Sequence, residues 1–448
     1  MLNNSVDSPS EPSPSALALF PLGVFLLLFI GVGGYLTMQG VDFAFYQLPA
    51  PVAALPAVIL ALILSKDKLN KALEHFLRGV GHNDIMAMCM IYLLAGAFAA
   101  VAKATGGVDA TVNLGLSLLP ASFILPGIFI ISAFISTAMG TSMGTIAAVA
   151  PVALGIAQVA GIDTSLMAGV VLSGAMFGDN LSIISDTTIA ATRSQGCHMK
   201  DKFRENLFIA LPAAAAAIAI FMMSNSVTDA PAAESFEWIK VLPYITILVL
   251  AVSGLNVFVV LGIGILLAGT IGMVSAADYT LGNYVKDIYA GFGNMQEIFL
   301  LSMLIGGIGE LMRRQGGLAW LTGLVGRVIG AFSKDHNTGS NLKASELGIA
   351  GLVALTNVCT ANNTVAIIVS GGVARKLAEE NGVTARRSAS LLDIFSCVIQ
   401  GLLPYGAQAL LLGSVFALSP LSVVSHSYYC LLLAASGIIA VFLKRRRQ

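Results

Sequence analysis

Long apolar runs separated by short polar loops make up most of the chain. Runs that begin at Ala16, Leu207 and Tyr428 approach or exceed the roughly 20 apolar residues that a membrane-crossing helix requires. We count about ten to twelve such runs, and a helix satisfies all of its backbone hydrogen-bonding groups within one membrane segment. The pattern predicts an all-α, polytopic membrane protein.

The composition agrees with this pattern and excludes several classes of protein. Of the 448 residues, 56% are hydrophobic and 11% are charged, whereas an ordinary soluble domain carries about 25% charged residues. The net charge is zero and no polar block exceeds a loop, so we expect neither a nucleic-acid partner nor a second globular domain. The cysteines form no Cys-x-x-Cys pair and the histidines no His-Glu-x-x-His motif, so we expect no resident metal, disulfide or cofactor.

Basic residues gather in alternate loops. The basic segments are 66–78, 193–204, 375–387 and 444–447, whereas the loops between them carry an excess of acidic residues. Because loops rich in Lys and Arg stay in the cytoplasm, both termini are predicted to be cytoplasmic in a bacterial inner membrane. Residues 1–15 are rich in Ser and Pro and lack the basic start of a signal peptide, which predicts a disordered tail before a retained first span.

The chain also resembles itself, at an offset of roughly 210 to 220 residues. The matching pairs of segments begin at Gly79 and Gly291, at Ile135 and Leu355, and at Met176 and Ile394. A basic loop precedes the first copy and an acidic loop precedes the second, which places the copies in opposite orientations. We therefore predict two inverted-topology repeats, an N-terminal half over 16–240 and a C-terminal half over 241–448, as is typical of secondary transporters.

Polar interruptions occur twice in each half. The hydroxyl-rich stretches STAMGTSMGT from Ser136 and TNVCTANNT from Thr356 predict the tips of re-entrant hairpins. The stretches GDNLSIISDTT from Gly178 and QGLLPYGAQ from Gln400 predict one broken transmembrane helix in each half. Non-helical backbone at membrane depth must be buried in protein or line a wet cavity, so we expect all four stretches to face one another near the bilayer midplane.

The interruption after Gly178 offers oxygen ligands for a hard cation such as Na⁺. Carboxylate, hydroxyl and carbonyl oxygens suit such an ion, and a carboxylate at membrane depth can also exchange a proton. The candidate ligands in this segment are Asp179, Asn180, Ser182, Ser185, Asp186 and Thr187, of which Asp179, Ser185 and Asp186 are the expected metal (Na⁺) ligands. In the second half the candidate site residues are Thr360, Asn362, Asn363, Thr364, Asp393 and Pro404.

Several of these residues also have a purely structural interpretation. Asp179 and Asp186 can serve as capping or interhelical carboxylates, and Asn362 and Asn363 can cap the turn of the hairpin. The cost of placing a charge in a membrane favours a functional role for the two aspartates and, less strongly, for Asp393.

Three further acids have local explanations. Asp84 and Glu297 stand at the starts of their segments, where a carboxylate favours the helix N-terminus. Glu310 is followed by Arg313 and Arg314, at the spacing of ion pairs along one helix face. We expect capping for the first two, and for Glu310 either pairing or function.

The first broken segment carries a family resemblance. The pattern Gly-Asp-x-x-Ser-x-x-Ser-Asp-Thr from Gly178 resembles the signature of the NhaC-type Na⁺/H⁺ antiporter family, which belongs to a larger group of ion transporters with inverted repeats. The resemblance covers about residues 75 to 415. One departure is Ile183, where family members usually carry proline, whereas the second break keeps Pro404. The family also contains exchangers of organic acids and carriers of amino acids.

The resemblance and the oxygen-rich segment together predict a Na⁺/H⁺ antiporter that works by alternating access. The alternative is a Na⁺- or H⁺-coupled transporter or exchanger of an amino acid or small organic acid, whose carboxylate would suit the helix N-termini at the hairpin tips. An enzyme is not expected, because no nucleophile with a base is seen in the sequence. The expected partners are membrane lipid, Na⁺ and protons as transported ions, and in the alternative an organic solute; a homodimer stays open.

Overall fold

The computed structural model describes residues 13–41, 44–118, 120–224, 235–275, 278–332 and 338–443. Two predicted segments, most of the tail over 1–15 and the basic segment 444–447, lie outside these residues. Every regular element in the described part of the chain is helical, which confirms the all-α prediction.

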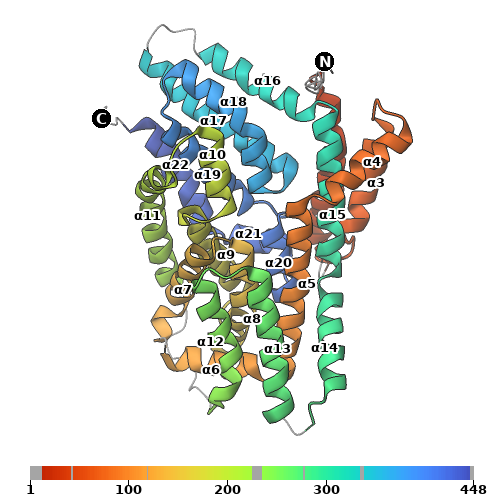
Figure 1. Ribbon diagram of the computed structural model, residues 1–448, viewed down its shortest axis with the longest axis vertical. Coiled ribbons are helices and arrows are strands. Elements are labelled where there is room, and N and C mark those ends of the chain that lie inside the picture. Colours follow the sequence, from red (N-terminus) through yellow and green to blue (C-terminus); the bar gives the residue numbers. More distant parts are fainter. Residues whose placement is uncertain are drawn as a thin grey trace, which may run out of the picture.

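The helices form a tall bundle (Figure 1). The first half contains α1 (Phe20–Leu26), α2 (Val32–Met38), α3 (Ala50–Ile63), α4 (Leu69–Val80), α5 (Asn83–Ala104), α6 (Gly107–Leu118), α7 (Ile124–Met139), α8 (Ser142–Ala160), α9 (Thr164–Leu181), α10 (Asp186–Gln195) and α11 (Met199–Ser224). The second half contains α12 (Trp238–Val252), α13 (Val257–Ser275), α14 (Leu281–Asn294), α15 (Gln296–Arg314), α16 (Gly317–Phe332), α17 (Thr338–Thr360), α18 (Asn363–Asn381), α19 (Ala385–Gln400), α20 (Ala407–Phe416), α21 (Pro420–Ser425) and α22 (Tyr428–Phe442). Short 3-10 or π segments adjoin some of them.

Many of these helices are suited to a membrane. Among the described residues, eight helical stretches are long and apolar enough to cross it, and the pair α14 and α15, bent by 44°, makes a ninth if it counts as one span. Four shorter apolar helices, α3, α12, α20 and α22, accompany them. The polytopic character is thus confirmed, whereas the total of about ten to twelve spans stays a prediction, since it depends on which short helices cross the bilayer.

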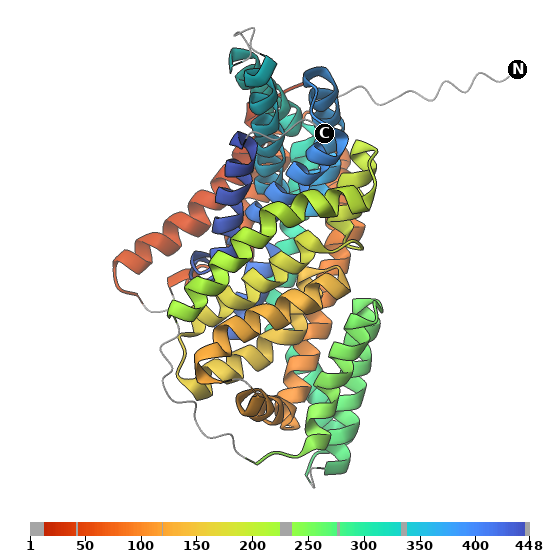
Figure 2. The ribbon, with the colours of Figure 1, turned by 90° about the vertical axis from the view of Figure 1, so that its left-hand side faces the viewer.

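The predicted internal repeat is visible in the helix boundaries. Adding 221 to the first and last residue numbers of α8 and α10 gives the bounds of α18 and α20. The first hairpin, α7–α8, lies in the lower half of Figures 1 and 2, and the second, α17–α18, in the upper half. The repeat of elements is therefore present, and the inverted relation of its two copies stays a prediction.

Each hairpin packs against the broken helix that follows it. Helices α7 and α8 contact α9, and α17 and α18 contact α19. The short helices after the breaks cross to the other half, because α10 packs on α18 and α19 while α20 packs on α8 and α9. This exchange brings both hairpin tips and both breaks to one region, as the sequence predicts.

Close backbone approach makes this packing possible in the first half. A Cβ added at Gly178 of α9 would stand 2.4 Å from the carbonyl oxygen of Ala133 in α7, so only glycine fits. Small residues at such contacts are the usual means by which membrane helices pack closely. The two hairpin tips turn through the left-handed backbone region, at Gly140 (φ 68°) and at Ala361 (φ 51°). Glycine adopts this conformation easily, whereas alanine does so only at some cost.

Both predicted helix breaks are present. Residues 182–185 separate α9 from α10, although Ile183 stands where the family resemblance predicts proline. Residues 401–406, which include Pro404, separate α19 from α20. In the first break, Ser182 and Ser185 replace the missing helical bonds, since Ser182 Oγ accepts from the Ile184 amide (3.3 Å) and Ser185 Oγ accepts from the Thr188 amide (3.2 Å).

Candidate functional site

A cavity of ≈ 110 Å³ lies where the two hairpin tips meet the two broken helices. Helix α5 supplies the remaining wall. The polar residues that line the cavity are Asp84, Thr141, Ser142, Asp179, Asp186, Thr187, Asn362, Asn363, Thr364, Gln400 and Gln408. Six of the predicted site residues are therefore brought together here, and three carboxylates face the same small space.

Asp179 is the buried acid of this cavity. It occupies the last turn of α9 and is 5% exposed. Its Oδ2 accepts a hydrogen bond from Ser142 Oγ (2.8 Å), the first residue of α8 at the tip of the first hairpin. The hydroxyl thus holds the carboxylate toward the cavity wall and supplies a neutral oxygen beside it.

A chain of polar contacts continues from Asp179 into the second half. Gln408 Nε2 donates to Ser142 Oγ (3.0 Å), and Gln408 Oε1 accepts from Gln400 Nε2 (2.8 Å). Gln400 Nε2 also donates to the carbonyl oxygen of Ala361 at the second hairpin tip (3.2 Å). One hydrogen-bonded series therefore connects both hairpin tips and both broken helices.

Asp186 and Asp84 complete the set of acids. Asp186 is the first residue of α10 and has an exposed side chain. Asp84 lies in the first turn of α5, where its Oδ2 is 3.7 Å from His82 Nδ1. Both carboxylates sit at helix N-termini, where the backbone dipole stabilises negative charge. The local role predicted for Asp84 is thus compatible with a place in the cavity wall.

The hydroxyls of the first break are mostly used within the break itself. Ser185 is the N-cap of α10, and its Oγ also contacts Thr187 Oγ1 (2.9 Å) and Thr188 Oγ1 (3.0 Å). Ser182 is buried and bonds the Ile184 amide. Neither serine lines the cavity, whereas Thr187 does.

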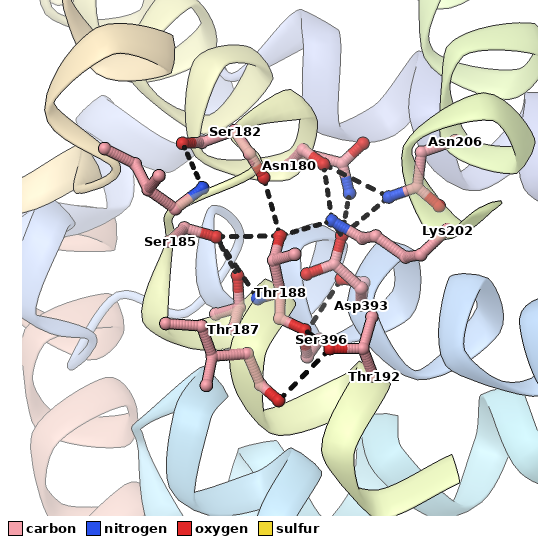
Figure 3. A network of polar contacts seen from close by, with 12 residues as sticks. Asn180, Ser182, Ser185, Thr187, Thr188, Thr192, Lys202, Asn206, Asp393 and Ser396 are labelled. Atoms are coloured by element: carbon pink, nitrogen blue, oxygen red, sulfur yellow. Dashed lines mark hydrogen bonds and ion pairs between the residues drawn. The ribbon is translucent and has the colours of Figure 1, made fainter. Parts of the chain in front are cut away.

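A second polar cluster surrounds the end of α9 without lining the cavity (Figure 3). Lys202 Nζ lies 2.6 Å from Asp393 Oδ2, and both side chains are fully buried. The same ammonium donates to the carbonyl oxygen of Asn180 (2.9 Å) and to Thr188 Oγ1 (2.7 Å). Asn180 Nδ2 and Asn206 Nδ2 donate to Asp393 Oδ2 at 2.9 and 2.7 Å. Asn180 and Asp393 are therefore brought to each other, and away from the cavity that Asp179 lines.

Comparison with known proteins places this geometry in context. A model of the Na⁺/H⁺ antiporter family matches residues 16–226. The Na⁺/H⁺ antiporter NhaC of Bacillus subtilis is 22% identical over 396 residues, which cover 82% of this chain and 85% of that protein. The NhaC of Alkalihalophilus pseudofirmus is 23% identical over 378 residues, covering 76% and 79%. The resemblance to the NhaC-type Na⁺/H⁺ antiporter family is confirmed.

A further relative differs in cargo. The malate-2H⁺/Na⁺-lactate antiporter of Bacillus subtilis is 24% identical over 430 residues, covering 90% of this chain and 88% of that protein. Its likeness extends over more of this chain than that of either NhaC protein. Overall similarity to NhaC-type proteins therefore leaves the cargo to be argued from the site.

Three predicted residues of the second half lie outside this cavity. Thr360 lines a different cavity of ≈ 360 Å³, where its hydroxyl donates to the carbonyl oxygen of Thr356 (3.0 Å). Pro404 is buried within the second break, and Asp393 pairs with Lys202. A still larger cavity of ≈ 510 Å³, lined by α5, α6, α8, α15 and α20, contains none of the predicted site residues. Volume alone would thus point away from the predicted site residues.

Two further acids have structural partners, although Glu297 does not cap the helix that was expected. Glu310 pairs with Arg313 (2.7 Å) and Arg314 (2.6 Å). Glu297 Oε1 accepts from the amide of Ala50, so it caps the N-terminus of α3 and not that of its own helix.

The basic loops expected from the sequence need correction, because most of 66–78, 193–204 and 375–387 is helical. Residues 193–204 were expected to form a basic loop, but α10 extends to Gln195 and α11 begins at Met199. Lys202 is consequently a fully buried helical residue. The physical reason is its partner Asp393, because a buried ammonium requires an opposite charge and hydrogen-bond acceptors.

Sequence reasoning missed several polar residues of the site. Ser142, Gln400 and Gln408 lie inside the predicted interruptions and were passed over in favour of acids and asparagines. Polarity within an apolar segment was the available signal. For Lys202 and Asn206 the sequence gives little signal, since their partner Asp393 comes from the other half of the chain.

The residues suit a mobile ion better than a tightly chelated metal. In the described part of the chain, no three His, Cys, Asp or Glu side chains are grouped closely enough to hold a metal. A Na⁺ ion in the cavity would instead combine a carboxylate with hydroxyl, amide and water oxygens. Weak, mixed coordination of this kind allows an ion to bind and also to leave.

Proposed function

We propose that the chain is a secondary Na⁺/H⁺ antiporter, with the acidic cavity as the site that Na⁺ and protons share. The observation that carries the proposal is the meeting of Asp84, Asp179 and Asp186 in one small cavity between both hairpin tips and both breaks. The family match and the two NhaC relatives support the same function.

The charge of the cavity favours a cation. Three carboxylates line it, and no lysine or arginine is among the lining residues. Asp179 would bind Na⁺ with Ser142 beside it, and Asp186 would attract the ion from the more exposed side. The Asp179 carboxyl group needs either a proton or, when it is ionised, a bound cation, because an isolated charge is costly away from water.

Competition for the same carboxylate would couple the two ions. A proton on Asp179 removes the charge that attracts Na⁺, and bound Na⁺ disfavours the protonated form. Na⁺ affinity should therefore fall as the pH falls. An exchanger arises if the protein changes the side of access only when the carboxylate carries one ion or the other.

Alternating access would use the repeat. Each short helix after a break packs on the opposite half, so rocking of one half against the other would move α10 and α20 relative to the cavity. We propose the opposite orientation of the halves, a bacterial inner-membrane location and cytoplasmic termini as parts of this account.

The second candidate function is exchange of a small organic acid. It is favoured by the malate/lactate antiporter relative and by the starts of α8, α10, α18 and α20, whose residues reach the cavity and whose dipoles attract carboxylates. The size of the cavity opposes it, since ≈ 110 Å³ is well below the roughly 300 Å³ of the smaller ligand pockets. The three resident acids also oppose it, because they would repel a second anion.

Transport by purified protein in liposomes distinguishes the two functions. A pH gradient is imposed, and its collapse is followed after addition of Na⁺ alone, of K⁺ alone, or of Na⁺ with a panel of amino and organic acids. The proposal predicts collapse by Na⁺ alone. Collapse only when an organic acid accompanies Na⁺ would replace the proposal with the second candidate.

A further inference from the structure

The ammonium of Lys202 occupies a position built from oxygen atoms of three kinds. Its three acceptors are the Asp393 carboxylate (2.6 Å), the Asn180 carbonyl (2.9 Å) and the Thr188 hydroxyl (2.7 Å). They come from the C-terminal end of α9, from α10 and from α19, while Lys202 itself reaches in from α11 (Figure 3). A carboxylate, a carbonyl and a hydroxyl are also the ligands that a hard monovalent cation prefers.

The break in the helix creates one of these ligands. In an uninterrupted helix the carbonyl of Asn180 would accept from the amide of Ile184, four residues on. That amide bonds Ser182 Oγ instead, so the carbonyl is left to Lys202 and to Asn206 Nδ2 (3.1 Å). A freed carbonyl at a helix C-terminus attracts positive charge, which is how broken membrane helices coordinate cations.

Further oxygens in the cluster have unused acceptor capacity. Asp393 Oδ1, Asn180 Oδ1 and Asn206 Oδ1 are buried, and none of them has a hydrogen-bond partner among the described residues. Each residue contributes its other atoms to the Lys202 cluster. The cluster is thus richer in acceptors than a single ammonium with three donors requires.

We propose that this cluster is a second monovalent-cation site, and that the Lys202 ammonium is its permanently attached cation. The site is separate from the cavity, because neither Lys202 nor Asp393 is among the cavity-lining residues. Because the Lys202 ammonium occupies this second site, the protein binds one Na⁺ fewer than its two oxygen-rich sites could hold. Lys202 therefore sets the number of Na⁺ ions bound per chain.

The experiment removes the ammonium and keeps the rest of the side chain. Lys202→Met has a similar stem and vacates the volume of the NH₃⁺ group, leaving Asp393 without its counter-charge. Equilibrium binding of radioactive Na⁺ to purified protein is measured at alkaline pH, with K⁺ as the competing salt. We expect Lys202→Met to bind one more Na⁺ per chain than the wild type, and to gain thermal stability on Na⁺ addition beyond the gain of the wild type.

A matched control removes the carboxylate as well. Lys202→Met with Asp393→Asn retains the packing but lacks the negative charge, so the additional Na⁺ and the additional stabilisation should both disappear. A buried pair can be replaced by neutral groups with little loss, whereas removal of one partner leaves an uncompensated charge. The comparison therefore isolates the charge from the packing.

The same substitution in the Asp179→Asn variant tests this proposal independently of the proposed Na⁺/H⁺ exchange. In Asp179→Asn the cavity loses its buried carboxylate, so Na⁺ binding there should be lost. Lys202→Met combined with Asp179→Asn should still bind one Na⁺. If the Asp179 cavity is not a Na⁺ site, Asp179→Asn will bind as the wild type does, and the extra Na⁺ of Lys202→Met will still decide the present proposal.

Folding outcomes are also decisive. Lys202→Met that folds only in the presence of Na⁺ supports the proposal. The proposal is overturned if folded Lys202→Met binds no additional Na⁺. It is equally overturned if Na⁺ fails to restore folding to Lys202→Met, whether or not the double variant folds, because the ammonium then cannot be replaced by another cation.

Discussion

The two broken helices occupy matching places in the repeat but carry different side chains. Asp179 in the first corresponds to Gln400 in the second, at the same offset of 221 residues that relates α8 to α18. Asp186 likewise corresponds to Ala407. Both helices break, and both approach the same cavity, yet the acids of the breaks belong to the first half alone. The scaffold is duplicated, whereas the charge that we propose binds the ions is not.

The surroundings of the two breaks differ in the same way. The carbonyl freed at Asn180 is held by the Lys202 ammonium. In the second half, the side chain of Tyr405 donates from its hydroxyl to the carbonyl of Val358 (2.6 Å), and Gln400 bonds Ala361, so neutral groups hold that break. One break is organised by charges and the other by amides and a phenol. This difference suggests that the second break supports the site and that the first performs the exchange.

The largest expected effect comes from comparing the matched positions. Asp179→Asn should reduce Na⁺-driven proton movement in liposomes to background and leave the protein folded, because a neutral amide is cheaper to bury than a carboxylate. Gln400→Met, which removes the amide at the matching position, should lower the rate without abolishing exchange. Equal loss in both variants would mean that the two breaks share the chemistry.

The orientation of the halves gives the next largest effect, an all-or-none difference in labelling. Thr164 and Ala385 are the first residues of α9 and α19 and lie 221 residues apart. Single cysteines are introduced at these positions in a protein that lacks the native cysteines. In intact cells the two thiols should differ in their reactivity with a reagent that cannot cross the membrane. Inverted halves predict that Thr164→Cys reacts and Ala385→Cys does not. Reaction of both, or of Ala385→Cys alone, would contradict the inversion.

A smaller effect is expected at Asp186. Its side chain is exposed, so water and salt weaken its pull on an ion in the cavity. Asp186→Asn should lower the apparent Na⁺ affinity about tenfold, equivalent to roughly 1.4 kcal/mol, and exchange should persist at high Na⁺. The measurement is the Na⁺ concentration that gives half-maximal exchange at several pH values. A complete loss of exchange at saturating Na⁺ would mean that Asp186 is as essential to exchange as Asp179.

The smallest effect is expected at Ser185. The structure uses its hydroxyl to cap α10, so Ser185→Ala should cost about 1 kcal/mol of stability, seen in thermal unfolding, and leave Na⁺ affinity nearly unchanged. The sequence, in contrast, predicts Ser185 as a Na⁺ ligand. A clear loss of Na⁺ affinity with unchanged thermal stability would favour the sequence-based interpretation.

Local patterns were sufficient to predict the turns between α7 and α8 and between α17 and α18, as well as the two breaks, whereas the re-entrant character of the hairpins stays a prediction. Hydroxyls, amides and glycines inside apolar segments are costly unless they serve a turn or a site, so the stretches near Gly140, Ala361 and Ser182 could be recognised from the sequence. The break at Ser182 forms without the usual proline, because the Ser182 and Ser185 hydroxyls satisfy backbone amides there.

Contacts between the two halves could not be predicted from such local patterns. Lys202 resembles a loop residue in the sequence, since it stands among other basic and polar residues, and only the fold brings it to Asp393. The same is true of Gln408, whose partner Ser142 lies 266 residues away. Polar residues whose partners are distant in sequence need the packing of the helices before their role can be assigned.

The most direct test of the central claim is the proton release that accompanies Na⁺ binding. Na⁺ is added to purified protein in a weakly buffered solution, and the pH change is recorded for the wild type and for Asp179→Asn, with K⁺ as the control salt. If Na⁺ and protons compete for Asp179, the wild type releases protons on Na⁺ addition, does so less as the starting pH rises, and Asp179→Asn releases none. Na⁺ binding to the wild type without proton release at any pH, or equal release by Asp179→Asn, would contradict the account.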